Sequence, residues 1–138
     1  MEPYVHVVQY YETDKMGITH HSNYIRWMEE ARIDFLRQIG WDYGKLEEEG
    51  LASPVTAVDC KYRGSTTFPD KIGITIGVSD YDGVRLKLRY IMTNQDGKIV
   101  CEAHSEHCFL GKDGRFARMA KEYPDLHDTL ISLKDRGE

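Results

Sequence analysis

Residues 22–39, SNYIRWMEEARIDFLRQI, decide the fold, because they form a long amphipathic segment. At about 100° per residue, apolar side chains gather on one broad side of the predicted helix and charged side chains on the other. The apolar side holds Tyr24, Trp27, Met28, Ala31, Phe35, Leu36 and Ile39. Ser22 or Asn23 is expected as the N-cap, and Gly40 is expected to end the helix. Because this apolar side is wide and rich in aromatic residues, we expect a large element, such as a sheet, to pack against it.

The flanking sequence predicts strands on both sides of this helix. Four later segments are rich in β-branched residues or alternate apolar with polar residues, and the turns at 81–83 and 94–97 each contain a glycine. The expected strands are 4–11, 54–63, 71–79, 84–93 and 98–110, with a loop at 12–21, a short helical turn at 41–50 anchored by Leu46, and a C-terminal helix at 122–134. Strands in a run, rather than in alternation with helices, predict an α+β fold with an antiparallel sheet of about five strands.

The length and composition of the chain argue against several classes of protein. The chain has 138 residues, which predicts one domain over residues 1–138. Its net charge of −5 argues against a general nucleic-acid binder. No apolar run is long enough for a membrane span, and no signal peptide is visible at the start. Three scattered cysteines indicate reduced thiols in a cytoplasmic protein. One helix on one sheet face makes a thin core, so pairing with a second copy is expected.

The loop before the long helix holds the densest set of reactive side chains. They are Tyr10, Glu12, Asp14, His20, His21 and Asn23. If the first strand continued, Tyr10, Glu12 and Asp14 would share one face, with Asp14 near the N–H groups at the start of the helix. A carboxylate beside such donors can attack an acyl carbon or activate a water, while the donors stabilise the oxyanion. Gly17 would let the backbone approach a ligand closely. The competing interpretation is that Asp14 caps the helix or closes an Asx turn, with both histidines in solvent.

Basic residues form a second candidate site. Arg85, Lys87 and Arg89 share one face of a predicted strand and could cradle phosphates, although an ordinary solvated sheet face has the same pattern. Arg63 has the same two interpretations. His104 and His107 would point to opposite faces of a strand, so we expect no metal site, and nothing indicates a cofactor.

Residues 9–32, QYYETDKMGITHHSNYIRWMEEAR, resemble the signature of the 4-hydroxybenzoyl-CoA thioesterase family, in particular its acyl-CoA thioesterase branch. The family pattern is an aromatic strand, then T-D-x-x-G-x-x-x-H-x-N-Y, then a helix with an E-x-A-R ending. The matching residues are Thr13, Asp14, Gly17, His21, Asn23, Tyr24, Glu30, Ala31 and Arg32. This resemblance implies a hot-dog fold, a long helix wrapped by an antiparallel sheet, in dimers or tetramers whose active sites lie between subunits.

The resemblance also implies an activity and roles for residues. It implies hydrolysis of an acyl-CoA thioester, with Asp14 as the catalytic nucleophile or general base and His21 and Tyr10 in support. Gly17, Asn23 and Tyr24 are then expected to contact substrate, as are Arg63 and Ser65 from the segment 61–66 at one side of the acyl pocket. Two other functions stay open, namely hydrolysis of acyl groups from acyl carrier protein and non-catalytic binding of acyl-CoA.

Overall fold

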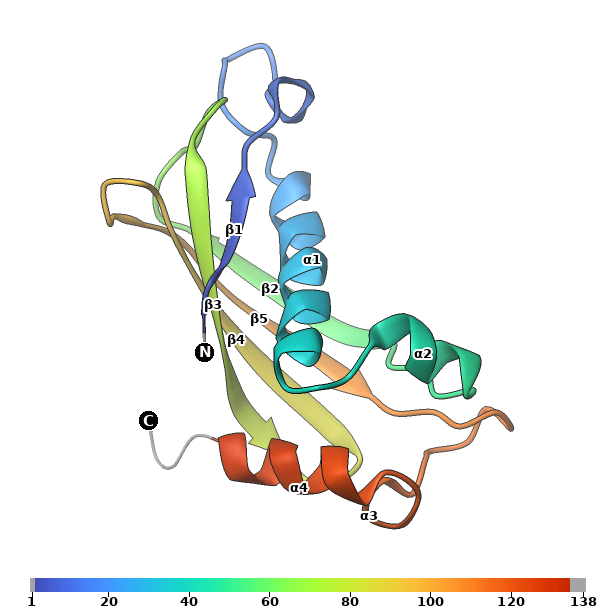
Figure 1. Ribbon diagram of the computed structural model, residues 1–138. Helices are drawn as coiled ribbons and strands as arrows, with labels where there is room; N and C mark the ends of the chain where they lie inside the picture. The colour runs from blue at the N-terminus through green and yellow to red at the C-terminus, as the bar shows by residue number, and fades with distance from the viewer. Residues whose placement is uncertain (1, 135–138) are drawn as a thin grey trace. The chain divides into compact units, whose positions relative to one another are not determined.

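The fold is α+β, with five strands and a long helix, in the computed structural model, which describes residues 2–134 (Figure 1). The strands are β1 (Tyr4–Val7), β2 (Val55–Tyr62), β3 (Lys71–Tyr81), β4 (Arg85–Thr93) and β5 (Ile99–Cys108). They form one antiparallel sheet in the order β1-β3-β4-β5-β2. The predicted class and the predicted number of strands are therefore confirmed.

Helix α1 (Ser22–Gln38) forms where its amphipathic pattern predicts it. Its apolar side is buried, and Trp27, the largest member, has no exposed surface. Gly40 ends the helix as expected: its φ of +95° suits glycine, and its N–H donates to the Arg37 carbonyl at 3.0 Å. The predicted N-cap is wrong, because the helix already begins at Ser22 and Asn23 therefore lies inside its first turn.

The chain folds into two compact units, and each is described separately. The first contains the residues up to Phe35 together with Asp59–Ile76 and Tyr90–Ala103. Within it, β1 pairs antiparallel with β3 in the register Tyr4 to Ile74, and the thiol of Cys60 on β2 donates to the Met28 sulfur on α1 at 3.6 Å. Its buried core is Val8, Tyr24, Trp27, Met28, Ala31, Phe35, Ile72, Ile74, Tyr90, Met92, Val100, Cys101 and Ala103.

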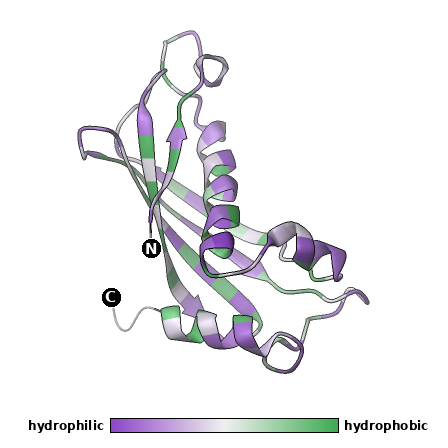
Figure 2. Cartoon of the chain, viewed as in Figure 1, coloured by the Kyte–Doolittle hydropathy of each residue, from purple (hydrophilic) through white to green (hydrophobic). Residues whose placement is uncertain are grey.

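The second unit contains Leu36–Val58, Gly77–Arg89 and the residues from His104 onward. Its helices are α2 (Tyr43–Glu48), α3 (Met119–Glu122) and α4 (Pro124–Leu133). Leu46 is buried in α2 as predicted. The helix predicted at 122–134 forms as α4, and α3 is a further short helix before it that was not predicted. The two are separate because Pro124 has no N–H to continue α3 and suits the first turn of a new helix. Leu86 and Leu88 are buried and alternate with exposed Arg85 and Lys87, the stripes visible on β4 in Figure 2.

The first strand is shorter than predicted, and this changes the site. It ends at Val7, and Tyr10–Glu12 form a 3₁₀ turn, η1. Tyr10 is therefore 77% exposed while Glu12 is 4% exposed, so the expectation that Tyr10, Glu12 and Asp14 share one face is wrong. The physical reason is that three hydrogen-bond donors draw the Glu12 carboxylate inward.

Within residues 2–134, no helix has both the length and the apolar character needed to cross a membrane.

Candidate active site

Asp14 lies in a tight loop that is closed by several backbone hydrogen bonds. Thr13 and Thr19 form an antiparallel bridge, and the Asp14 N–H donates to the Ile18 carbonyl at 2.9 Å. The loop turns at Gly17, whose φ is +78° and whose N–H donates to the Asp14 carbonyl at 2.9 Å. A Cβ at Gly17 would meet no atom within 4 Å, so the backbone conformation, and not crowding within the chain, is what favours glycine there.

The side chain of Asp14 is fixed by this loop. Its Oδ1 accepts the N–H of Met16 at 2.8 Å, which closes an Asx turn. The competing interpretation from sequence is therefore right about the turn. The turn does not exclude chemistry, because a carboxylate with one oxygen held by a backbone donor is oriented for a reaction at the other.

The base of the loop is closed by Glu12 and Asn23. The Glu12 carbonyl accepts the N–H of His20 at 2.9 Å and the Nδ2 of Asn23 at 3.0 Å. Asn23 Nδ2 also lies 3.2 Å from the His20 carbonyl, to which it donates. The Asn23 side chain thus ties the loop to the first turn of α1.

Residues far along the chain hold the other side of the loop. Thr66 and Thr19 form a buried pair, in which the Thr66 hydroxyl donates to Thr19 Oγ1 at 2.7 Å and the Thr19 N–H donates to the Thr66 carbonyl at 2.8 Å. The Tyr24 hydroxyl lies 2.9 Å from Thr66 Oγ1. The Thr67 hydroxyl donates to the Gly17 carbonyl at 2.6 Å. The β2–β3 connection therefore holds the Asp14 loop from Gly17 to Thr19.

Asp14 lines two open clefts. The first, about 400 Å³, brings together five predicted residues, Asp14, His21, Tyr24, Arg63 and Ser65, and is completed by Met16, Ile18, Thr19, Tyr62 and Gly64. The second, about 420 Å³, contains the predicted Tyr10, Asp14 and Gly17 together with Thr13, Lys15, Thr67 and Phe68. Asn23 lines neither cleft, and its hydrogen bonds give it a structural task.

Aromatic rings form walls of both clefts. The rings of His20 and His21 stack with centroids 4.4 Å apart, and Tyr62 meets Tyr24 edge-on at 5.0 Å. In the second cleft, Tyr10 meets Phe68 edge-on at 6.0 Å. The sequence pattern assigns no role to Tyr62 and Phe68, because only the fold brings them to the Asp14 loop. The available signal was weak: Tyr62 lies in the segment 61–66 expected beside the pocket, and Phe68 follows two residues after it.

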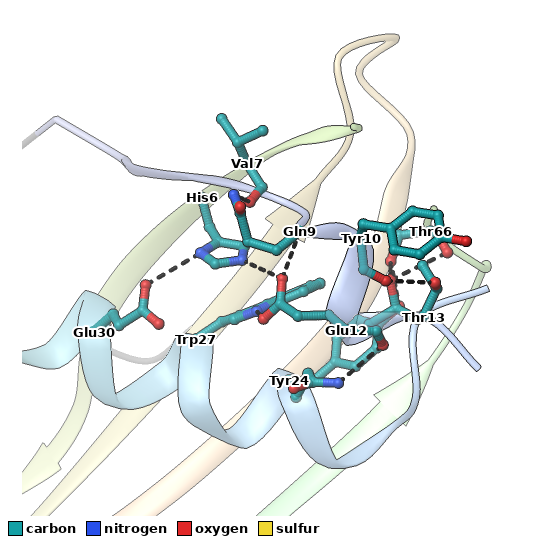
Figure 3. Close-up of polar contacts among 12 residues, drawn as sticks. His6, Val7, Gln9, Tyr10, Glu12, Thr13, Tyr24, Trp27, Glu30 and Thr66 are labelled. Atoms are coloured by element: carbon teal, nitrogen blue, oxygen red, sulfur yellow. Dashed lines mark hydrogen bonds and ion pairs between the residues drawn. The ribbon is translucent and has the colours of Figure 1, made fainter. Parts of the chain in front are cut away.

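Glu12 is a buried carboxylate behind the site (Figure 3). Its Oε1 accepts the Gln9 N–H at 2.8 Å and lies 2.8 Å from His6 Nε2, and its Oε2 accepts the Trp27 Nε1–H at 2.8 Å. Burial alone would raise the pKa of Glu12, but the hydrogen bonds from Gln9, His6 and Trp27 outweigh it and lower the pKa. Glu12 is therefore an ionised structural residue and does not face the clefts.

All three cysteines are free, and two of them interact across β2 and β5. A hydrogen bond from the Cys101 thiol lowers the pKa of Cys60 to about 7, although burial opposes this. The same hydrogen bond raises the pKa of Cys101. Burial raises the pKa of the neighbouring Tyr62 to about 12, and the charge on Cys60 adds to this.

The basic residues fall into two groups. Arg63 is at the first cleft, and its Nε donates to Glu102 Oε2 at 2.8 Å. Arg85, Lys87 and Arg89 share one face of β4 as predicted but line neither cleft. Lys87 lies 3.4 Å from Glu106, an ion pair exposed to solvent.

His104 is exposed and His107 is buried, as expected for residues on opposite faces of a strand. The His107 Nε2 lies 2.7 Å from Ser105 Oγ. In the described part of the chain, no three His, Cys, Asp or Glu side chains are grouped to hold a metal ion.

Known proteins are similar to this chain in architecture and in sequence. A solved DHNA-CoA thioesterase from Staphylococcus aureus is 30% identical, with a TM-score of 0.89, over 95% of this chain and 88% of that one. A Bacillus subtilis (strain 168) protein named "Putative acyl-CoA thioesterase YneP" is 31% identical over 128 residues, covering 92% of this chain and 93% of that protein. A 1,4-dihydroxy-2-naphthoyl-CoA hydrolase from Thermosynechococcus vestitus is 28% identical over 111 residues, 80% of this chain and 76% of its own.

The family model described as the thioesterase-like superfamily matches residues 8–129, which include the Asp14 loop, α1 and all strands except β1. The antiparallel sheet with a long helix is the hot-dog arrangement of these thioesterases, as the resemblance implied. The chain belongs to the thioesterase-like superfamily.

Proposed function

We propose that this protein hydrolyses an acyl-CoA thioester to the free acid and CoA, with Asp14 as the catalytic carboxylate. The observation that carries the proposal is the position of Asp14, which lines both clefts while a backbone N–H holds one of its oxygens. The names of the relatives support the substrate class, since those proteins are thioesterases or hydrolases of CoA esters.

The chemistry asks little of the protein, because a thiolate leaves readily. As a general base, Asp14 takes a proton from water while the water oxygen attacks the thioester carbon, the C–S bond breaks, and the proton passes to the CoA thiolate. As a nucleophile, Asp14 attacks that carbon directly, the C–S bond breaks, and CoA leaves as the thiolate and is protonated. Water then hydrolyses the resulting anhydride to the free acid and regenerates the Asp14 carboxylate. Either route needs a donor for the oxyanion, and the backbone N–H of His21, directly before α1, is the proposed source, because the N–H groups of Ser22, Asn23 and Tyr24 already donate to His20 or His21.

Roles for the other residues follow from their place. His21 and Tyr10, one in each cleft, are proposed to orient the water or the carbonyl. Tyr24, Ser65 and Arg63 would contact substrate in the first cleft, with Arg63 near the anionic part of CoA. Gly17 would allow the acyl group close to the backbone. Arg85, Lys87 and Arg89 remain candidates for phosphate contact.

A turnover panel tests the proposal. Acyl-CoAs of different chain length and with aliphatic or aromatic acyl groups are incubated with the protein and a thiol-reactive dye, and acyl carrier protein esters are run in parallel. We expect thiol release from CoA esters and a loss of at least ~100-fold in kcat for Asp14→Asn. Thiol release only from the carrier-protein esters would indicate the second enzyme class. Tight binding without release would indicate a binding module.

The quaternary structure is part of the proposal. We propose a homodimer or homotetramer with active sites between subunits, in the cytoplasm. The open walls of both clefts support this, because a second copy could close them. Light scattering coupled to size exclusion measures the mass directly, and an active monomer of 16.0 kDa would contradict it.

A further inference from the structure

Glu30, one of the residues that match the family signature, has no part in the reaction proposed above. Its Oε1 accepts the Tyr4 hydroxyl at 2.6 Å and lies 3.1 Å from His6 Nδ1. The other ring nitrogen of His6, Nε2, lies 2.8 Å from Glu12 Oε1. The imidazole of His6 therefore bridges a carboxylate on α1 and a carboxylate on η1, as Figure 3 shows.

The ring of His6 is held from both sides, with Glu30 Oε1 at 3.1 Å from one nitrogen and Glu12 Oε1 at 2.8 Å from the other. The side chains of His6 and Glu12 are 11% and 5% exposed, and a carboxylate as enclosed as that of Glu12 needs hydrogen-bond partners. The ring also packs on Trp27, with centroids 4.6 Å apart. Of the other ionisable groups near the bridge, Tyr4 donates to Glu30, and Asp34 interacts with Tyr4.

Glu12 connects this bridge to the catalytic loop. Its carboxylate is held by β1 through His6 and by α1 through Trp27. Its carbonyl accepts the N–H of His20, which closes the base of the loop, and Asp14 follows two residues later. A movement of the Glu12 backbone would therefore move both ends of the loop. Displacements of about 1 Å can cost on the order of 100-fold in rate when a catalytic group must be aligned.

We propose that Glu12, held by His6 and Glu30, is a positioning residue for Asp14. Glu12 touches no substrate and acts only by fixing the base of the loop. The inference rests on the proposed function, because it assigns Glu12 an effect through Asp14. The proposal also assigns a role to Glu30 of the signature, which contacts the other nitrogen of the His6 ring.

Glu12→Gln and His6→Gln test this proposal. Glutamine keeps the shape of Glu12 but turns an NH₂ toward one of its donors, Trp27 Nε1 or the pair of Gln9 N–H and His6, so at least one hydrogen bond is lost. We expect kcat on the best acyl-CoA to fall at least tenfold for each variant, with KM within twofold of wild type. Hydrogen exchange at the amides of Asp14 and Gly17 should become at least tenfold faster, while the amides of the β1–β3 ladder keep their protection. Asp80→Asn, which removes the exposed ion pair with Lys134 in the other unit, is the control and should change neither kcat nor the exchange rates.

The outcomes separate the two proposals. If Asp14→Asn keeps the wild-type kcat, the proposed function fails. If Asp14→Asn loses activity but Glu12→Gln keeps kcat within twofold, only the positioning proposal is overturned. A fall in kcat without faster exchange in the Asp14 loop also overturns it. Should Glu12→Gln not fold by circular dichroism, the same two readouts on His6→Gln decide.

Discussion

The hydroxyl of Tyr24 offers a quantitative test of how the Asp14 loop is held. Thr66 donates its hydroxyl proton to Thr19 Oγ1, and Thr19 donates its own to the Thr66 carbonyl at 3.2 Å. Tyr24 must therefore be the donor in its contact with Thr66 Oγ1 at 2.9 Å. All three side chains belong to buried residues, with at most 6% of their surface exposed.

The direction of these hydrogen bonds determines how much each substitution should lower the free energy of unfolding. Tyr24→Phe removes one hydrogen bond but leaves the Thr66 hydroxyl bonded to Thr19, so the free energy of unfolding should fall by about 1 kcal/mol. Thr66→Val keeps the volume but leaves the buried Tyr24 hydroxyl without its acceptor and Thr19 without a donor, so the loss should be about 2–3 kcal/mol. In the double variant the Tyr24 hydroxyl is already absent, and the two effects should overlap by about 1 kcal/mol.

Urea unfolding of the four proteins, followed by far-ultraviolet circular dichroism, measures this double-mutant cycle. A coupling free energy below about 0.3 kcal/mol would mean that the two substitutions are additive and would refute the proposed direction of the hydrogen bonds. Ser22→Ala, at the exposed start of the same helix, is a control that should not couple to Thr66→Val.

Three further predictions concern neighbouring groups. The pKa of Glu12 is lowered from 4.5 in the folded protein, so its ionisation contributes stability that is present above that value and is lost as the pH falls through the lower, folded-state pKa. The free energy of unfolding should therefore decline less steeply between about pH 5 and 3 for Glu12→Gln than for wild type, and equal slopes would contradict this. Cys101→Ala should raise the pKa of Cys60 from about 7 toward its ordinary value of 9.0. Alkylation of Cys60 by iodoacetamide at pH 7 should then be slower, and an unchanged rate would contradict the hydrogen bond assigned between the two thiols. Gly17→Ala should lower the free energy of unfolding by about 1 kcal/mol because φ is positive there, and a neutral effect in urea unfolding would contradict this.

The parts of the fold that could be predicted are those with a local pattern. Helix α1 shows an amphipathic side over its whole length, and the turns at Gly83 and Gly97 lie at positions of positive φ, as expected. The Asp14 loop was located because polar residues and a glycine interrupt two regular patterns. In each case the signal lies within one segment of the sequence.

The parts that could not be predicted depend on partners far along the chain. The segment 4–11 is rich in Val and Tyr, and nothing local shows that Glu12 turns inward to Trp27, 15 residues away. The same holds for Tyr62 and Phe68, which reach the clefts because Thr66 binds Thr19 across 47 residues. Sequence patterns therefore located the loop, while the walls around it depend on tertiary contacts.

The threonine pair also constrains the order in which the chain can fold. Gly17 and Thr19 are held by hydrogen bonds with Thr67 and Thr66, so this side of the loop cannot be fixed until that segment has formed. Contacts this distant in sequence require a costly chain closure and form slowly compared with a helix turn. During synthesis, α1 can therefore acquire its structure while the reactive aspartate is restrained only by the hydrogen bonds of its own loop. The loop reaches its final geometry only when the segment that contains Thr66 and Thr67 has been added.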